Sequence, residues 1–415
     1  ADAQSGVGIL RSTDGGDTWH PTNVTYNVSS SSGFHFIEVN PLTGTMLAGE
    51  RTGMWRSIDD GATWTKVRPS GEYFDAEWKT GTTRVYTIGG GSAWGGNTLQ
   101  VSTDDGVTWT SSASGLPSPS SIGKAKLSVC RGTPSTVFVH LSSASNFSTL
   151  GVYGSTNDGA TWSARNTTLN AAQGQGWYNL TIAVDPSNPD RVLLGGVENW
   201  GSSNGGVSFA EVGDGYGLGT DTAIHWDHHV LEYEPGSDSV LWVGTDGGVW
   251  RSTDDGATWL SRREGIGTYQ FYDISVAQSD AAAILGGTQD NGVPGRVTLN
   301  TWFTSNLFAD GFVTNVDPAN ANVVYSEWQF GNHVKSTDGG GSWIDIQAGL
   351  GPDSGDWLAP TDLDPSDSNR LFTEATDGIY RTTNGGSSWG RVSTHSAIWI
   401  SISPVDGNVV WTTDS

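Results

Sequence analysis

The densest cluster of residues that could do chemistry is the segment 224–229, Ile-His-Trp-Asp-His-His, which holds three of the eight histidines. On a β-strand, His225, Asp227 and His229 would share one face, with about 6.8 Å between alternate positions. That spacing suits a metal site, with calcium or zinc as the ion, or a charge-coupled histidine–aspartate pair. The alternative is a structural network in which imidazole and carboxylate groups satisfy one another. His225, His228 and His229 are therefore candidate substrate-binding residues, and Asp227 is a candidate catalytic carboxylate.

A second set of candidates is the aspartates in the Asp- and Gly-containing loops 245–248, 289–292 and 376–378, which are Asp246, Asp290 and Asp377. Each loop could be only a turn, because Asp-Gly is a common hairpin sequence. Hydrolysis of a glycosidic bond with inversion needs two carboxyl groups about 6.5–9.5 Å apart, one of which holds a proton. Asp246 and Asp290 would form such a pair if they lie on neighbouring sheets, with Asp227 or His228 tuning a pKa.

The elements that must position these residues follow from an internal repeat. The pattern Ser-x-Asp-x-Gly-x-Thr-Trp ends at Trp19, Trp64, Trp109 and Trp259, and looser copies end at Trp162, Phe209, Trp343 and Trp389. In such a turn Asp or Asn accepts backbone N–H groups and glycine supplies a positive φ. The tryptophan is expected to pack between neighbouring sheets, so these aspartates are predicted to be structural. This repeat is the Asp-box, and the chain resembles the Asp-box (BNR-repeat) β-propeller superfamily over its whole length.

The spacing of the repeat predicts the number of sheets. Most steps are 45–53 residues, and one step of 84 residues contains a unit, 271–303, whose box has decayed. The sequence therefore predicts an all-β protein, a single β-propeller of nine four-stranded blades, with eight or ten as alternatives. In the clearest unit the strands are expected at 229–233, 240–243 and 249–252, with a fourth from 258. Residues 1–415 are predicted to form one domain, closed by a blade that 1–20 and 397–415 share.

Composition excludes several classes of function. With 20 Lys and Arg against 44 Asp and Glu, the net charge is −24 and the pI is about 4.4, which disfavours nucleic-acid and membrane-surface partners. The single cysteine, Cys130, permits neither an internal disulfide nor a cysteine-based metal cluster. No apolar run reaches the ~18 residues of a membrane helix. The chain begins Ala-Asp-Ala-Gln, which is typical of a trimmed N-terminus and predicts a secreted, extracellular protein, expected to be monomeric.

A narrower resemblance concerns the loop around Asp246. Residues 245–251, Thr-Asp-Gly-Gly-Val-Trp-Arg, resemble the T-D-x-G-G-x-Y-R loop of the xyloglucan-cleaving, inverting propeller glycosidases. In that family the aspartate of this loop is a catalytic carboxylate, and a second Asp-Gly loop supplies its partner. The resemblance thus implies a catalytic role for Asp246 and, through 376–381, for Asp377. That family pairs two seven-bladed propellers, whereas the repeat here predicts one ring.

The order of motifs also resembles that of uncharacterised secreted sortilin/BNR-like repeat proteins. Their H-x-D-x-H-like strand, N/T-D-G-G loop, Q-F-Y and G-G-T-Q-D-N-G segments correspond to 225–229, 245–248, 270–272 and 286–292. This resemblance implies one shared site, to which Tyr272 and Gln289 would contribute substrate contacts. Trp328 and Trp357 are further candidates for binding sugar, because aromatic rings suit the C–H faces of sugars and neither belongs to a box. Other loop aromatics are Trp94, Trp177, Tyr178, Trp200 and Tyr269.

These observations lead to one hypothesis and its alternatives. The hypothesis is a secreted glycoside hydrolase of the inverting β-glucanase or xyloglucanase type, which acts on a polysaccharide or oligosaccharide and requires no cofactor. The alternative is a non-catalytic glycan- or peptide-binding propeller, as in sortilin-like receptors. A lyase could use His228 or Tyr272 as a base, but Lys and Arg are scarce for an acidic polysaccharide. A sialidase needs an arginine cluster, whereas four arginines occupy equivalent strand positions before boxes, which are Arg11, Arg56, Arg251 and Arg381.

Overall fold

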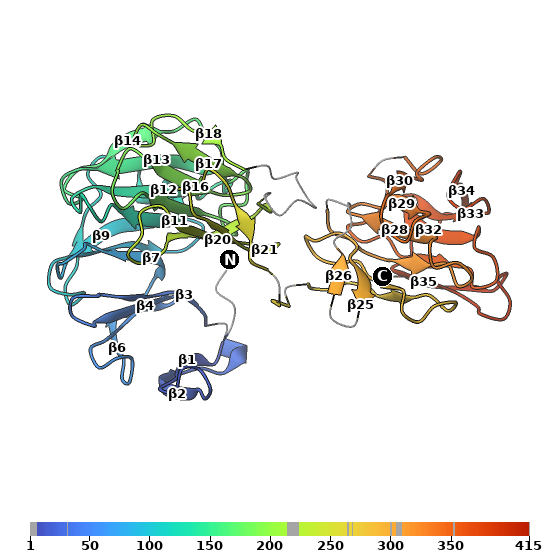
Figure 1. Ribbon diagram of the computed structural model, residues 1–415, viewed down its shortest axis with the longest axis horizontal. Helices are drawn as coiled ribbons and strands as arrows, with labels where there is room; N and C mark the ends of the chain where they lie inside the picture. Colours follow the sequence, from blue (N-terminus) through green and yellow to red (C-terminus); the bar gives the residue numbers. More distant parts are fainter. Residues whose placement is uncertain are drawn as a thin grey trace. The chain divides into compact units, whose positions relative to one another are not determined.

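The computed structural model describes residues 6–30, 32–213, 224–263, 265–267, 269–298, 301–303, 309–351 and 353–414. The chain divides into two compact units (Figure 1). The first unit comprises residues 1–215 and 221–264, and the second comprises 216–220 and 265–415. The helices of the described residues are two short 3-10 turns, η1 (Val28–Ser30) and η2 (Pro119–Ser121). No helix in this part of the chain is long and apolar enough to cross a membrane.

The first unit contains, in its described residues, one two-stranded and five four-stranded antiparallel sheets. The two-stranded sheet is β1 (Gly8–Arg11) and β2 (His20–Thr25). The four-stranded sheets are β3 (Phe34–Val39), β4 (Met46–Glu50), β5 (Gly53–Ser57) and β6 (Thr65–Arg68); β7 (Glu72–Trp78), β8 (Val85–Gly91), β9 (Thr98–Ser102) and β10 (Thr110–Ser111); β11 (Ile122–Val129), β12 (Val137–Ser143), β13 (Thr149–Ser155) and β14 (Ser163–Asn166); β15 (Thr181–Val184), β16 (Val192–Gly195), β17 (Asn199–Ser202) and β18 (Ala210–Glu211); and β19 (His228–Tyr233), β20 (Leu241–Thr245), β21 (Gly248–Ser252) and β22 (Leu260–Ser261).

The second unit contains, where its residues are described, three four-stranded sheets and one two-stranded sheet. The four-stranded sheets are β23 (Ser275–Val276), β24 (Ile284–Leu285), β25 (Gly295–Thr298) and β26 (Thr301–Phe303); β27 (Asn315–Val316), β28 (Val324–Trp328), β29 (Asn332–Ser336) and β30 (Ile344–Asp345); and β31 (Thr361–Leu363), β32 (Leu371–Ala375), β33 (Gly378–Thr382) and β34 (Gly390–Ser393). The two-stranded sheet is β35 (Trp399–Ile402) and β36 (Val410–Thr413).

Each four-stranded sheet follows chain order, so the repeat that forms it folds into one up-and-down blade of a β-propeller. The prediction of an all-β fold built of four-stranded blades is confirmed. The unit without a recognisable box, 271–303, forms β23 to β26, and the strands of the clearest unit begin and end within two residues of their predicted bounds. The single ring over residues 1–415 stays a prediction, because its closing blade would combine β1–β2 of one unit with β35–β36 of the other.

The turn between the third and fourth strands is held by side-chain hydrogen bonds. In the copy at 252–259, the Ser252 hydroxyl donates to Asp254 Oδ1 (2.8 Å) and accepts the Gly256 N–H (2.9 Å). Asp254 also accepts the N–H (2.8 Å) and the hydroxyl (2.6 Å) of Thr258, and the Trp259 indole donates to the Gly256 carbonyl (3.1 Å). These contacts occupy the carboxylate, so this aspartate has a structural role.

The same turn is also hydrogen-bonded to the turn between the first and second strands of its own sheet. In six sheets its fourth residue donates its backbone N–H to a carbonyl in the turn between the first and second strands. The pairs are Asp105–Thr83, Asp158–Ser135, Gly205–Asp190, Asp255–Ser239, Gly339–Asn322 and Gly385–Asn369. All these turns therefore lie together at one end of the sheets, the end opposite the loops that contain Asp246 and Asp290.

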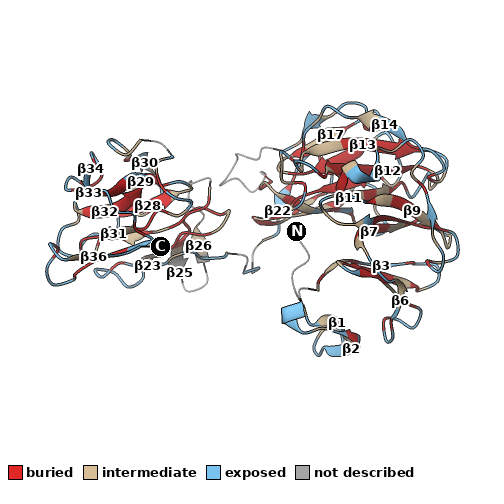
Figure 2. Ribbon diagram, turned by 180° about the vertical axis from the view of Figure 1, so that it is seen from behind, coloured by how far each residue is buried: buried red, intermediate tan, exposed pale blue. Residues whose placement is uncertain are grey.

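Tryptophans from these turns complete the core between neighbouring sheets. Trp259 is 1% exposed and packs with Leu193 and Tyr233, which come from β16 and β19. Figure 2 shows the buried strands concentrated inside the stacked sheets of each unit. Trp19, which belongs to the two-stranded sheet β1–β2, is 59% exposed. The predicted packing of these tryptophans is therefore found where a neighbouring sheet covers the turn.

The turn aspartates tolerate loss of charge but not loss of the acceptor. Asp104 accepts hydrogen bonds from Ser102 and Thr108, and those from Thr108 lower its pKa to about 2. We expect Asp104→Ala to lower the free energy of unfolding by about 1 kcal/mol at pH 7. Asp104→Asn should unfold at the wild-type urea concentration, because Asn157 makes the equivalent contacts in its own turn. Below pH 3.8 the wild type should lose part of this contribution, whereas the Asn variant should not. Equal midpoints for wild type and Asp104→Ala would contradict this role.

A buried histidine makes the first unit sensitive to acid. His140 is fully buried between Thr149 and the Thr181 carbonyl, and burial lowers its pKa to about 4. In the unfolded chain a histidine binds a proton near pH 6.5. Protonation of His140 alone should therefore lower the free energy of unfolding by about 3 kcal/mol between pH 6.5 and pH 4. We expect His140→Gln to remove this part of the pH dependence in urea unfolding and to leave the part due to His228, whose pKa burial also lowers to about 4, while the exposed-site variant His395→Gln keeps both. A parallel pH profile for wild type and His140→Gln would show that His140 does not contribute.

Candidate functional site

In the first unit, Asp246 occupies the turn between β20 and β21, where Thr245 pairs with Gly248. Its Oδ1 lies 2.6 Å from His229 Nε2, and the Tyr178 hydroxyl donates to both carboxylate oxygens at 3.0 Å. The rings of Tyr178 and His229 meet edge to face, with centroids 4.7 Å apart. The side chain of Asp246 is 10% exposed and that of His229 is 15% exposed. Asp246, His229 and Tyr178, here called the Asp246 cluster, hold one carboxylate in a fixed orientation with limited access to solvent.

The expected strand through His225, Asp227 and His229 is wrong for its first two residues. β19 begins at His228, and Asp227 has φ 60°, a left-handed conformation that ends the alternation of faces. His225 instead packs against Gly247, where an added Cβ would lie 2.4 Å from its ring. Asp227 accepts a hydrogen bond from the Asn179 side chain. His229 is the member of this trio that contacts the Asp246 carboxylate directly, at 2.6 Å.

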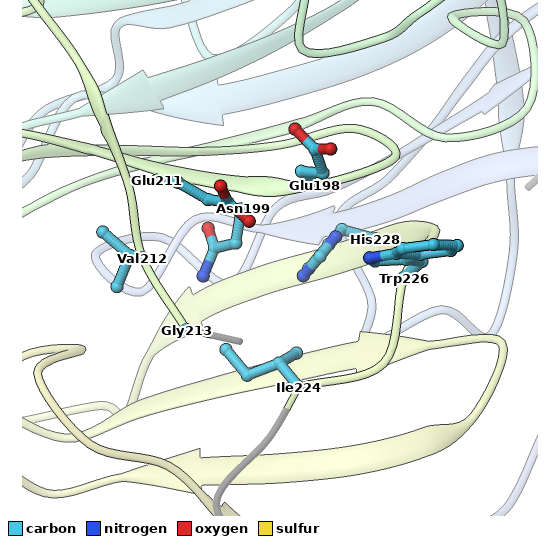
Figure 3. A pocket seen from close by; sticks show the side chains of 8 residues that line it. All are labelled: Glu198, Asn199, Glu211, Val212, Gly213, Ile224, Trp226 and His228. Atoms are coloured by element: carbon cyan, nitrogen blue, oxygen red, sulfur yellow. The ribbon is translucent and has the colours of Figure 1, made fainter. Parts of the chain in front are cut away.

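His228 turns into a small pocket away from these contacts (Figure 3), lined by Glu198, Asn199, Glu211, Val212, Gly213, Ile224, Trp226 and His228 itself. His228 Nδ1 lies 3.2 Å from the Gly196 carbonyl, to which it can only donate, so Nε2 carries a lone pair. Burial lowers the pKa of His228 to about 4, so the ring is neutral at pH 7. Nε2 and both polar atoms of the Asn199 side chain have no hydrogen-bond partner among the described residues.

The three histidines therefore have different neighbours, and the metal site considered for His225, Asp227 and His229 stays a prediction. Within the described ranges, no group of three or more His, Cys, Asp or Glu side chains could hold a metal ion. The alternation of faces along a strand could not predict where these side chains lie, because the left-handed residue Asp227 turns the chain just before β19 begins.

In the second unit, Asp290 lies beside a carboxylate that the sequence analysis missed. The N–H of Asp290, which has φ 61°, donates to Asp310 Oδ1 (2.8 Å), and the Gln329 amide donates to Asp310 Oδ2 (2.6 Å). Asp310 is 5% exposed. Asp310-Gly311 comes just before the segment that leads to β27, outside the loops after second strands that hold the predicted aspartates. The Asp-Gly dipeptide is the signal in the sequence that marks this residue.

Aromatic side chains surround this pair. The ring of Tyr272 packs on Phe312 (4.7 Å between centroids), Phe312 on Trp357 (5.7 Å) and Trp357 on Phe330 (5.4 Å). Burial raises the pKa of Tyr272, and the charges of Asp310 and Asp290 raise it further. Trp357 is 50% exposed, Phe330 44% and Tyr272 39%. These four aromatic residues with Asp290 and Asp310 are here called the Asp290 surface.

Three other predicted residues of this unit have different surroundings. Trp328 packs against the core formed by β24 and β28, so it supports the sheet instead of covering its surface. Gln289 donates its backbone N–H to the Gln270 carbonyl, next to Asp290. Asp377 accepts hydrogen bonds from Tyr380 (2.8 Å) and Arg391 (2.7 Å) and is 54% exposed, as part of a surface ion pair.

A second missed residue of this unit holds a proton near neutral pH. Glu374 at β32 is 4% exposed, and burial, together with the charge of Asp356, raises its pKa to about 7. Asp356 precedes Trp357, so the charge that acts on this carboxyl group comes from the loop that carries part of the Asp290 surface. Nothing in the local sequence marks Glu374, because its pKa depends on the loop that covers it.

The structure thus joins Asp246 to His229 in the first unit, and Asp290 to Asp310 in the second. The predicted catalytic pair of Asp246 and Asp290 combines one residue from each unit and stays a prediction. The catalytic roles of Asp227 and Asp377, and the substrate contacts of His225, His228, Gln289 and Trp328, stay predictions as well.

Comparisons with known proteins point to one group of enzymes. No model of a known protein family matches the chain. A xyloglucanase of Paenibacillus sp is 34% identical over 132 residues, which cover 25% of this chain and 13% of that protein. A xyloglucanase of Acetivibrio thermocellus is 25% identical over 270 residues, which cover 53% of this chain and 30% of that protein.

Among solved structures, the GH74 xyloglucanase from Xanthomonas campestris matches with a TM-score of 0.61 and 19% identity, over 93% of this chain and 62% of that chain. The segments that match the Paenibacillus and Acetivibrio xyloglucanases cover less than a third of the length of those two proteins. The chain is similar in fold to a GH74 xyloglucanase and, over part of its length, similar in sequence to bacterial xyloglucanases.

Proposed function

We propose that this chain takes part in hydrolysis of xyloglucan or a related neutral β-glucan, with Asp246 as one of the catalytic carboxylates. The observation that carries the proposal is the Asp246 cluster, in which a carboxylate is oriented by His229 and Tyr178 inside the loop that resembles the xyloglucan-cleaving glycosidases. The similarity to bacterial xyloglucanases supports the same substrate class. A neutral glucan is also compatible with a net charge of −24. We further propose that the protein is secreted and monomeric, because such polysaccharides are found outside the cell.

The geometry around Asp246 suits a general base. In inverting hydrolysis, one carboxylate removes a proton from the attacking water while a carboxylic acid protonates the leaving oxygen. His229 and Tyr178 direct hydrogen bonds at Asp246, which fixes its orientation, and its partial exposure leaves room for the water. The acid must be a second carboxyl group, and Asp290 remains the candidate that the sequence predicts.

A second candidate function is glycan binding without catalysis, which the Asp290 surface favours. Exposed aromatic rings beside carboxylates provide C–H contacts and hydroxyl acceptors, the two interactions that retain a sugar chain. Tyr272, Phe330 and Trp357 offer the first kind of contact, and Asp290, whose backbone is held by Asp310, offers the second. This surface would serve a hydrolase as a substrate platform and a non-catalytic protein as its binding site.

Replacement of Asp246, the proposed general base, should strongly reduce turnover and leave the fold intact. We expect Asp246→Asn to lower kcat on xyloglucan by about 10²–10⁴-fold, the usual contribution of a positioned base. His229→Gln and Tyr178→Phe should each cost about tenfold, because they only orient the carboxylate. Release of reducing ends is the measurement.

The matched control is Asp59→Asn, which changes a turn aspartate to the residue found in other copies of the turn and should keep wild-type activity. Full activity in Asp246→Asn would remove Asp246 from the mechanism. Absence of activity in the wild type on xyloglucan and other neutral glucans would reject the hydrolase itself.

The aromatic platform should contribute to binding more than to turnover. We expect Trp357→Ala to weaken binding of xyloglucan oligosaccharides about tenfold in calorimetric titration, equivalent to about 1.4 kcal/mol. If the protein is a hydrolase, KM should rise with little change in kcat. Trp411→Ala is the control, because Trp411 is 56% exposed on β36 and carries no predicted role. Equal weakening in both variants would argue against a specific platform.

A further inference from the structure

A buried lysine lies directly behind the Asp246 cluster and belongs to a different sheet. Lys124, at the start of β11, is 3% exposed. Its Nζ donates to the Tyr178 carbonyl at 2.9 Å and lies 3.4 Å from the Trp177 carbonyl. A buried ammonium group is costly unless polar atoms surround it, so this arrangement fixes both partners strongly.

The residues that Lys124 holds form a turn that reaches Asp246. Tyr178 and Asn179 donate their backbone N–H groups to the Gln175 carbonyl at 2.7 and 3.0 Å, which closes the turn before β15. The Trp177 and Tyr178 carbonyls face Lys124, while the Tyr178 hydroxyl faces Asp246. The backbone and the side-chain end of one residue are thus fastened to two different elements, β11 and the β20–β21 turn.

We infer that Lys124 is a positioning residue that sets the orientation of Asp246 through Tyr178. The effect on catalysis rests on the proposed function, in which Asp246 acts on a glucan. The contacts that join Lys124 to Tyr178 and Tyr178 to Asp246 do not depend on it. Loss of the ammonium group would leave two carbonyls without this donor and free the turn at 172–179. The Tyr178 hydroxyl would then no longer be held over the carboxylate, although Lys124 touches neither the substrate nor Asp246 through the contacts described.

The neighbouring lysine provides a matched control. Lys126 lies two residues further along β11 and pairs with Asp75 at 3.0 Å, so it faces a different partner on β7. Both side chains are largely covered and both carry one charge. Lys126→Met therefore reproduces the loss of a covered charge on the same strand without touching the turn at 172–179.

The first measurement is the hydrogen–deuterium exchange of the turn, which does not depend on enzymatic activity. We expect Lys124→Met to accelerate hydrogen–deuterium exchange of a peptide covering 172–180 by about 10- to 100-fold, and Lys126→Met to leave it unchanged. Lys124→Gln, whose carboxamide still donates, should restore part of the protection. Unchanged exchange in Lys124→Met, or equal acceleration in Lys126→Met, would overturn the inference whether or not the protein is a hydrolase. If Lys124→Met does not fold, Lys124→Gln carries the same comparison.

Activity supplies the second measurement. We expect Lys124→Met to lower kcat about as much as Tyr178→Phe, and the double variant to be no worse than either, because both act through one contact. Additive losses would show that Lys124 does not act through Tyr178. If the wild type cleaves no glucan, the proposed function fails, while the exchange result still decides the role of Lys124.

Discussion

The hydrogen-bonded turn between the third and fourth strands is the interaction on which the rest of the structure depends. One Asp or Asn side chain satisfies the backbone of the turn, and in six sheets the turn is also tied to the connection between the first two strands. Both connections at one end of each sheet are therefore fixed by local contacts. Because the turn tryptophans also cover the neighbouring sheet, the same few residues determine the shape of a blade and its packing.

Rigidity at one end of the sheets leaves the other end free to vary. The loops that carry Asp246 and Asp290 contain no box, and they differ from one another in length and partners. Asp246 depends on His229 from its own sheet and on Tyr178 from the preceding one. Asp290 depends on Asp310, which leads into the next sheet. The candidate side chains are thus placed by contacts between sheets, so their positions depend on how the blades pack.

Much of the fold was predictable because the repeat is a local signal. The turn residues lie within eight positions, and their spacing predicts four-stranded sheets in chain order without any long-range information. The site was only partly predictable, since its contacts join residues far apart in sequence. Asp246 and His229 could be named from motifs, but Tyr178 and Lys124 are 68 and 122 residues from Asp246 in the chain. Asp227 shows a different limit, because one left-handed residue moved His225 and Asp227 off the expected strand.

The tie between the two turns also bears on how the protein ages. Asn204 and Asn384 of the repeated turn each precede a glycine, the sequence in which asparagine deamidates most readily, because the glycine nitrogen can attack the asparagine side chain. Here the N–H of Gly205 is donated to the Asp190 carbonyl (2.8 Å) and that of Gly385 to the Asn369 carbonyl (2.9 Å). The carboxamides are occupied as well, by Ser208 and Ser388. The contacts that shape the blades therefore also hold the reacting atoms apart, and they protect these two Asn-Gly pairs from spontaneous chemical damage for as long as the chain stays folded.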